Sequence, residues 1–373
     1  MGSGCDADGA SSRGPLVTWG CEDMPGHALH THVALARHAA DLLQCRYDGR
    51  LEDFCGEELP YCIPRGTLCG AECRQVFASA RPDPRRFLGG WVPARLLATK
   101  AIVHPLAPGE EPPDGWPTGF AGAVRDIVLD GATAFTAEGA VRAGEGLLAK
   151  GPVRVKAVGA SGGSGQFVAR SAGELDQVLA RAQDDGLIAG GLVLEEHLED
   201  AKTYSVGEIV LGDLSAAYVG LQETTDNNHG ERVYGGSRLF LVRGRSPQLL
   251  KLVSPEVATL CLTGLKFDQL AEREFGLVAS RRNYDVIVGT DHGGRRRCAV
   301  LEQSWRVGGA SPAELVALEA FAKDPARRHA VAASVERYGA TAVPPEGARL
   351  YFHGTDAAVG PMLKYAVVQG EER

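Results

Sequence analysis

Residues 153–166 read VRVKAVGASGGSGQ, and this stretch decides which fold the sequence predicts. Apolar and polar residues alternate over residues 152–158, which predicts a strand that carries Lys156. Four glycines follow, at positions 159, 162, 163 and 165. Glycine lets backbone N–H groups approach an anion closely, and a nearby lysine supplies a positive point charge. The stretch therefore favours a loop that binds the phosphates of a nucleotide.

The two common phosphate-binding motifs do not describe this loop. No Lys-Ser or Lys-Thr pair follows the glycines, as a Walker A loop requires, and the glycines do not open a helix as in G-x-G-x-x-G. Taken alone, the stretch is equally compatible with a plain hairpin. Its interpretation depends on the motifs further along the chain.

Two acidic residues interrupt apolar strand candidates in the last third of the chain. Asp285 lies within residues 284–289 and Glu302 ends residues 298–302, with a glycine-rich turn between them. A carboxylate in an apolar strand is unfavourable unless it is paired or binds a metal. Mg²⁺ is usually held by one or two carboxylates and substrate phosphates. The pair predicts a magnesium site; the alternative is that arginines at residues 281–282 or 295–297 neutralise both acids.

A third motif lies between these two. Residues 192–198, LVLEEHL, predict a strand that ends in the carboxylates of Glu195 and Glu196. Such an end, followed by a polar segment, is typical of a hinge that binds adenine and ribose. Alone, it is also compatible with the end of any strand.

Helices and strands alternate along the remaining chain without long runs of either, which predicts an α/β (α+β) protein. Further strands are expected at residues 15–19, 204–211, 214–222 and 238–242. Helices are expected at residues 30–45, 136–150, 171–184, 257–275 and 312–323. Ser171 and Glu174 have the spacing of a capping box, and Ser311 and Pro312 fit the cap and first position of a helix.

Composition argues against several classes of partner. The 373 residues include 39 basic and 47 acidic side chains, and the net charge of −8 argues against general binding to nucleic acid or anionic membranes. The sequence contains no run of eighteen apolar residues, so it predicts no membrane span. The small, polar residues 1–14 lack the features of a signal peptide, which predicts a disordered tail and a cytoplasmic location.

Seven of the nine cysteines precede residue 74. Their C-x6-C-x6-C-x3-C spacing differs from the close pairs of a zinc knuckle. In a reducing compartment we expect free thiols that act as small apolar residues, with a structural metal as the alternative.

The order of the three motifs resembles the ATP-grasp superfamily: lysine and glycine-rich loop, acidic hinge, aspartate, then glutamate beside an arginine. The resemblance spans roughly residues 91–318. Four segments are similar to a bacterial ATP-grasp family of unknown function, namely WVPARLLATKAIVHPL (91–106), TYSVGEI (203–209), DNNHGERVYGGS (226–237) and LEQSWRVGGASPAE (301–314). The resemblance implies an ATP-grasp fold with an N-terminal α/β pre-grasp domain.

This resemblance also implies a domain organisation. A tail at residues 1–14 would precede a pre-grasp domain at residues 15–98. A central or lid subdomain with the glycine-rich loop would occupy residues 99–191. A C-terminal subdomain with the metal site would occupy residues 192–373.

Carried over to this chain, the resemblance implies a role for each motif residue. The residues implied to bind the nucleotide are Lys100, Lys156, Gly162, Gly163, Ser164, Gly165, Glu195, Glu196 and Leu198. Those implied to bind Mg²⁺ are Asp285, Glu302 and Ser304, the last in a position usually held by asparagine. Lys156 and Arg306 would be catalytic, with Arg306 stabilising the transferred phosphoryl group.

The implied cofactors are ATP and Mg²⁺, and the implied reaction joins a carboxylate to an amine. The substrate carboxylate attacks the γ-phosphorus of ATP, and an amine then displaces phosphate from the acyl phosphate. Such transfer depends mainly on positioning and charge neutralisation. We expect a carboxylate–amine ligase that acts on a small carboxylate such as an amino acid or peptide. Because dimers are common in the superfamily, a homodimer belongs to the same expectation.

Two other functions remain open at this stage. One is a non-catalytic nucleotide-binding protein, favoured by Ser304 and by Thr203, which stands where a ribose-binding glutamate is usual. The other is a small-molecule kinase with the same fold.

Overall fold

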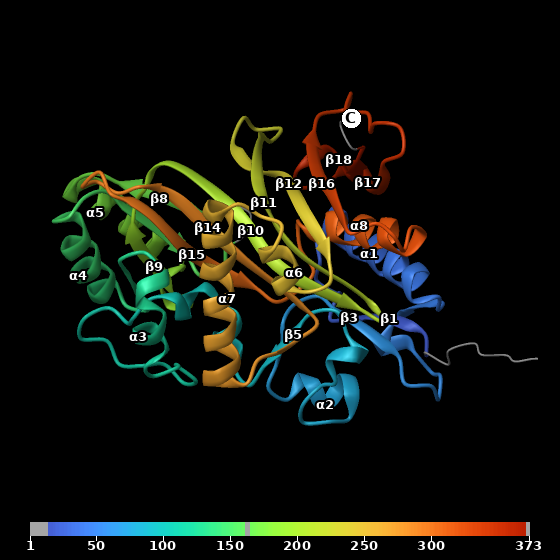
Figure 1. The fold of residues 1–373 in the computed structure, drawn as a ribbon. Coiled ribbons are helices and arrows are strands. Elements are labelled where there is room, and N and C mark those ends of the chain that lie inside the picture. The colour runs from blue at the N-terminus through green and yellow to red at the C-terminus, as the bar shows by residue number, and fades with distance from the viewer. Residues whose placement is uncertain (1–13, 161–164, 371–373) are drawn as a thin grey trace, which may run out of the picture.

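Four β-sheets organise the part of the chain that the computed structural model describes, residues 14–160 and 165–370 (Figure 1). An eight-stranded sheet runs through the middle of the molecule, and a four-stranded sheet lies at one end of it. Two three-stranded sheets complete the set.

The N-terminal sheet is parallel, with the strand order β2-β1-β3. Its strands are β1 (Leu16–Trp19), β2 (Tyr47–Arg50) and β3 (Tyr61–Pro64), and α1 (Gly26–Leu43) connects β1 to β2. The strand predicted at residues 15–19 is confirmed. β1 and β3 lack exposed residues because the sheet packs against neighbours, which explains why both read as short apolar runs.

The helix α1 begins four residues before the helix predicted at residues 30–45. The first N–H groups of a helix need acceptors from outside it. Asp356 supplies one, because its Oδ2 accepts from the N–H of His27 at 2.8 Å across 329 residues of sequence. Backbone hydrogen bonds from His27 and Ala358 hold the pKa of Asp356 well below its usual range. The local pattern cannot indicate this start, because its cap comes from a distant strand.

The four-stranded sheet has the order β6-β9-β7-β8 and shares one core with two helices. Its elements are β6 (Gly131–Ala134), β7 (Val153–Ala157), β8 (Gln166–Ala169), β9 (Leu192–Glu196), α4 (Ala137–Leu148) and α5 (Ala172–Asp184). Both helices were expected, and Ser171 caps α5 by accepting from the N–H of Glu174 at 3.3 Å. The Glu174 carboxylate accepts from the N–H of Arg170, so the predicted capping box is displaced by one residue.

This sheet crosses the boundary expected at residue 191. β9 pairs with both β6 and β7, so this strand belongs to the same sheet as the strand that carries Lys156. The sequence motif places Glu195 at the end of a strand but cannot show which sheet that strand joins. The remaining domain limits stay predictions.

The eight-stranded sheet has the order β15-β14-β10-β11-β12-β16-β18-β17, with antiparallel neighbours throughout. Its strands are β10 (Glu199–Leu211), β11 (Leu214–Asp226), β12 (Arg232–Arg243), β14 (Arg281–Thr290), β15 (Arg296–Ser304), β16 (His329–Tyr338), β17 (Arg349–Asp356) and β18 (Gly360–Gln369). The strand pair predicted around Asp285 and Glu302 is therefore confirmed, and the expected strands in β10, β11 and β12 are longer than predicted.

Both faces of this sheet are covered. Along β11, Ala216 and Tyr218 face a core shared with α1 and α8 (Ser311–Lys323). Ala217 and Val219 face a second core, which contains α7 (Pro255–Phe275). Alternate strand residues point to opposite faces, so one strand serves two cores.

Short elements fill the connections. They are β4 (Leu68–Cys69), β5 (Gly90–Val92), β13 (Val278–Ala279), α2 (Glu72–Phe77), α3 (Phe120–Val124) and α6 (Ser246–Leu250). The 3₁₀ turns are η1 (Leu51–Asp53), η2 (Pro84–Arg86), η3 (Arg95–Ala98), η4 (Lys100–Val103), η5 (Arg125–Ile127) and η6 (Ile188–Gly190). None of the helices described here combines the length and apolar character needed to cross a membrane. Seven cysteines within the described ranges are free thiols, namely Cys21, Cys55, Cys62, Cys69, Cys73, Cys261 and Cys298.

The N-terminus of α8 differs slightly from its prediction. The helix starts at Ser311 with Ala310 as the cap residue, so Ser311 is the first helical residue and Pro312 the second. The Ser311 hydroxyl accepts from the N–H of Gly308 at 3.0 Å and ties the preceding turn to the helix.

The buried imidazole of His38 makes stability depend on pH. His38 contacts Tyr351 and Glu319, and burial followed by the charge of Arg349 lowers its pKa to about 4. The unfolded chain thus binds a proton near pH 6.5 that the folded chain excludes, so stability is complete above pH 6.5 and falls toward pH 4. The wild type should lose up to about 3 kcal/mol of its free energy of unfolding through His38 as the pH falls, and we expect His38→Gln to lack this loss. Urea unfolding across pH 4–7 measures it, with the exposed His329→Gln as control; an unchanged slope in His38→Gln would contradict it.

Candidate active site

Lys156 lies in β7 with its ammonium group buried against the hinge strand β9. Its Nζ is 2.8 Å from Glu195 Oε1, and Glu195 Oε2 is 3.2 Å from His104 Nε2. The three side chains are at most 4% exposed. Burial alone would raise the pKa of Glu195, but Lys156 and His104 lower it to about 2. Glu195 is therefore an ionised hydrogen-bond acceptor at neutral pH.

The second lysine joins the glycine-rich loop to the acidic strands. Lys100 lies in η4, and its Nζ donates to the carbonyl oxygen of Ala160 at 2.8 Å. The same Nζ is 2.7 Å from Glu302 Oε2. One buried cation thus connects the start of the loop with a predicted metal ligand.

Asp285 and Glu302 face each other across β14 and β15. The register pairs them directly, so both side chains lie on one face of the sheet. Asp285 Oδ1 accepts from Gln222 Nε2 at 2.8 Å and from Asn283 Nδ2 at 3.0 Å. Burial and the charge of Glu302 raise the pKa of Asp285 to about 7. Two carboxylates this close together repel each other, and their oxygen atoms are ligands of the kind that a hard cation binds.

The alternative role for these acids, pairing with nearby arginines, is wrong. Four of the five arginines have another acidic partner: Arg281 pairs with Glu314, Arg282 with Asp268, Arg295 with Asp291 and Arg297 with Glu196. Arg296 pairs in the register with Thr290, at the far end of the hairpin from Glu302. Among the described residues, Lys100 is the cation that contacts Glu302.

Ser304 and Arg306 lie at the same end of β15. Ser304 pairs with Asn283 in the register, which places it on the face of Glu302. Arg306 follows in the turn before α8 and donates from Nη1 to the carbonyl oxygen of Val307 at 2.9 Å. Burial and the charge of Arg281 lower the pKa of Arg306, whereas Glu302 and Asp285 act in the opposite direction. Arg306 is therefore within electrostatic reach of both carboxylates.

The predicted loop and hinge residues are placed in part. Gly162, Gly163 and Ser164 lie outside the described residues, and Gly165 has a φ of +65°, which favours glycine. Glu196 points away from Glu195, because its Oε1 accepts from the N–H of Asp130 and pairs with Arg297. Leu198 is buried in a small apolar cluster with Leu129, Ile287 and Ala299.

Three polar residues of this site, His104, Gln222 and Asn283, were not among the predicted site residues. His104 reaches Glu195 across 91 residues, and Gln222 reaches Asp285 across 63. Neither contact can be read from spacing, because each depends on how distant strands pair. Asn283 is different: it stands two residues before Asp285, so strand alternation alone places both on one face.

The arrangement fits a magnesium nucleotide. Lys156 and Lys100 are buried cations, and Glu195 and Glu302 are the carboxylates that they contact. Within the described ranges, no group of three or more His, Cys, Asp or Glu side chains gathers around one point. Asp285 and Glu302 are thus a pair of facing carboxylates and not part of a larger cluster of such side chains.

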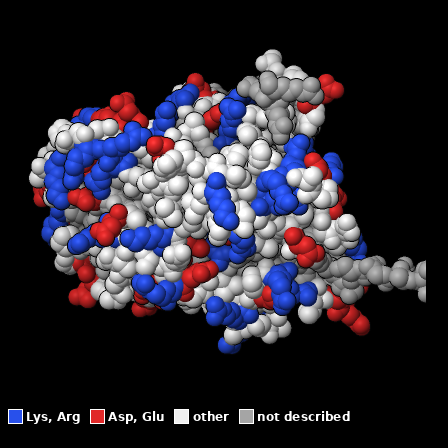
Figure 2. All heavy atoms as spheres, viewed as in Figure 1, with Lys and Arg blue, Asp and Glu red and all other residues white. Residues whose placement is uncertain are grey.

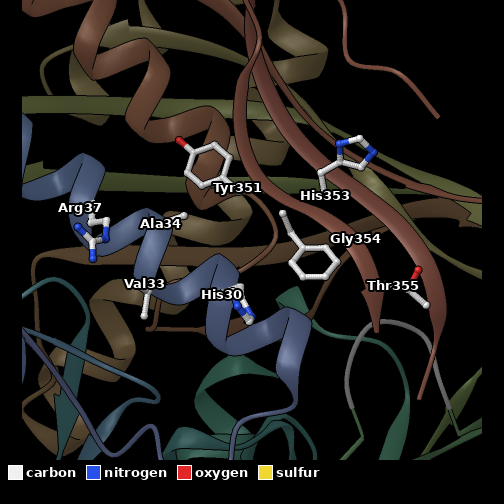
Figure 3. Close-up of a pocket in the computed structure, with 9 residues that line it drawn as sticks. His30, Val33, Ala34, Arg37, Tyr351, His353, Gly354 and Thr355 are labelled. Carbon is white, nitrogen blue, oxygen red and sulfur yellow. The ribbon is translucent and has the colours of Figure 1, made fainter. Parts of the chain in front are cut away.

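Other surface features lie apart from these residues. A hollow of about 510 Å³ lies between α1 and β17, with His30, Arg37 and Tyr351 among its lining residues (Figure 3). It contains none of the residues of the candidate site. Figure 2 shows Lys and Arg side chains gathered over the end of the molecule that carries α5 and β8 in Figure 1, with both signs interspersed elsewhere on this face.

The chain matches one protein-family model over most of its length. A family model described as "Protein of unknown function (DUF3182)" matches residues 18–366. No curated protein matches the sequence.

Solved structures share the fold at low sequence identity. The biotin carboxylase domain of Hydrogenobacter thermophilus 2-oxoglutarate carboxylase, solved with magnesium ADP and bicarbonate, has a TM-score of 0.53 and 13% identity, covering 96% of this chain and 87% of that one. Carboxyaminoimidazole ribonucleotide synthase from Aspergillus clavatus, complexed with ATP, has a TM-score of 0.51 and 11% identity over 95% and 94% of the two chains. Biotin carboxylase from Campylobacter jejuni has a TM-score of 0.51 and 12% identity, covering 95% of this chain and 87% of that one. The ATP-grasp fold predicted from the motif order is confirmed.

Proposed function

Because the chain belongs to the family described as "Protein of unknown function (DUF3182)", we propose a function from its site: an ATP-dependent ligase that joins a small carboxylate, such as an amino acid or peptide, to an amine. One observation carries the proposal. Lys100 contacts both Glu302 and the Ala160 carbonyl, so the phosphate loop, a phosphate lysine and a metal carboxylate converge. Similar folds solved with ADP or ATP support the same assignment.

Each residue has a distinct task in the proposed reaction. Lys156 and Lys100 neutralise the polyphosphate, and Glu195 accepts from the amino group of adenine. Arg306 stabilises charge on the phosphoryl group as the substrate carboxylate attacks it. The glycine-rich loop excludes water, which protects the acyl phosphate until the amine arrives.

The facing acids of β14 and β15 would form the metal site. Asp285 and Glu302 would hold Mg²⁺, with Ser304 beside them, and the bound ion would neutralise charge on the ATP phosphates. Asn283 and Gln222 donate to Asp285 and fix the direction of its carboxylate.

Nucleotide binding gives the first test. Ligand at about 100 times its Kd adds roughly 2.7 kcal/mol to stability, so Mg-ATP should raise the Tm of the wild type measurably. We expect Lys100→Gln to lose most of this increase, and the exposed Lys323→Gln to retain it. Differential scanning fluorimetry with Mg-ATP and with Mg²⁺ alone measures both. No increase in the wild type would contradict nucleotide binding.

Product analysis then separates the ligase from the two alternatives. The ligase forms ADP, phosphate and an amide when a carboxylate and an amine are supplied together. A phosphorylated product stable to amines would identify a small-molecule kinase. Binding of Mg-ATP without ADP formation over a broad substrate panel would identify a non-catalytic protein.

A further inference from the structure

A buried ion pair lies beneath the candidate metal site. Arg281 opens β14 and Glu314 lies in the first turn of α8, and their side chains are 1% and 0% exposed. The Arg281 Nε and Nη2 atoms donate to the carboxylate of Glu314 at 3.0 and 2.7 Å. Replacing such a pair by apolar residues is often neutral or stabilising in other proteins, so stability alone does not account for it. Its remaining hydrogen bonds point to a different role.

One set of bonds leads to Arg306. The remaining terminal nitrogen of Arg281, Nη1, donates to the carbonyl oxygen of Ser304 at 3.0 Å and to that of Arg306. These carbonyl groups belong to the turn between β15 and α8. Fixing both peptide groups fixes the direction in which the Arg306 side chain leaves the backbone.

A second set leads to Asp285. The Tyr218 hydroxyl lies 2.6 Å from Glu314 Oε1 and 3.1 Å from Asn283 Oδ1. Asn283 in turn donates from Nδ2 to Asp285 Oδ1. The hydroxyl has one hydrogen, and its shorter bond is to Glu314, so the ion pair fixes the position of the Tyr218 oxygen against which the Asn283 amide packs.

The backbone makes room for this network at Gly207. A Cβ atom on that residue would lie 2.5 Å from the Tyr218 hydroxyl and 2.1 Å from the Arg282 carbonyl oxygen. Any side chain at this position would displace the hydroxyl that connects Glu314 with Asn283.

From these contacts we propose that Arg281 and Glu314 are positioning residues, which hold Arg306 and Asp285 in the geometry needed for metal and phosphoryl binding. The inference rests on the proposed function, since it assigns a role toward the same site. Arg281 suits this role because its planar guanidinium binds a carboxylate and two carbonyl groups at fixed angles, which lysine cannot do.

Arg281→Lys tests the inference, with Arg282→Lys as its matched control. Arg282 is the next residue of β14, and it binds Asp268 of α7 at 2.9 Å from the opposite face. Both substitutions preserve the positive charge, so a difference between them in metal binding does not come from a change in net charge. Mn²⁺ binding, followed by electron paramagnetic resonance with and without ATP, reports on the site directly.

We expect Arg281→Lys to weaken Mn²⁺ binding about 10- to 100-fold, the range for residues that orient metal ligands. Arg282→Lys should remain within twofold of the wild type. Tyr218→Phe removes only a hydroxyl, and it should weaken Mn²⁺ binding in the same direction even where Arg281→Lys fails to fold.

Two results would overturn the inference, and they differ in meaning. Wild-type Mn²⁺ affinity in Tyr218→Phe and in folded Arg281→Lys would show that the network is structural only, with the proposed function intact. No Mn²⁺ binding by the wild type itself, with or without ATP, would remove the metal site and with it the proposed function.

Discussion

Lys156→Met is expected to lower the free energy of unfolding by about 3–5 kcal/mol and to abolish stabilisation by Mg-ATP. Lys156 and Glu195 are paired at 2.8 Å in the four-stranded sheet, with almost no exposure. Removing the lysine leaves an ionised carboxylate buried with only His104 beside it. Urea unfolding of the two proteins measures the loss.

A charge-balanced variant separates the two effects of that substitution. In Lys156→Met combined with Glu195→Gln, no buried carboxylate remains unpaired, so most of the lost stability should return. Mg-ATP should still fail to raise its Tm, because the phosphate lysine is absent. A double variant that is as unstable as Lys156→Met, or one that Mg-ATP stabilises as strongly as the wild type, would contradict the assigned pairing or role.

Asp285→Asn should change stability and activity in opposite directions. Asparagine keeps an oxygen that accepts from Gln222 and Asn283, and it removes a charge opposite Glu302. We expect the metal-free variant to melt at a higher temperature than the wild type. Its Mg-dependent ATP turnover should fall at least 10- to 100-fold, since even residues behind a metal ligand produce losses of that size.

The hairpin that carries Asp285 also supplies a control for that experiment. Asp291 lies in the turn after β14 and pairs with Arg295 and Arg297, at the opposite end of the strand from Asp285 and Glu302. Asp291→Asn should therefore leave ATP turnover unchanged. Equal turnover in Asp285→Asn and the wild type would remove Asp285 from the proposed metal site.

The sequence predicts those parts of the site that depend on strand periodicity and local order. Alternation around Asp285 and Glu302, with a short glycine-rich turn between their strands, implies an antiparallel hairpin, and the observed register pairs the two acids. The motif order also predicts the ATP-grasp fold, which the similar structures confirm.

Contacts between distant segments cannot be predicted from strand periodicity or local order. The position of β9 in the four-stranded sheet, the link from His104 to Glu195 and the network from Arg281 to Asn283 each depend on packing between separate elements. A single sequence records which residues are available but not which strand edge each will meet. Buried polar groups show this most clearly, since their partners are specific and remote.

The cap that Asp356 provides to α1 determines when this helix can complete its folding during synthesis. The acceptor for the first turn of this helix leaves the ribosome 329 residues after His27 does. Until then, the apolar face formed by residues such as Leu35 and Ala39 has no α8 or β17 to contact, although all of them share one core in the folded protein. α1 must therefore wait for a strand that is synthesised more than three hundred residues later, and during that interval its apolar face is exposed in the way that chaperones recognise.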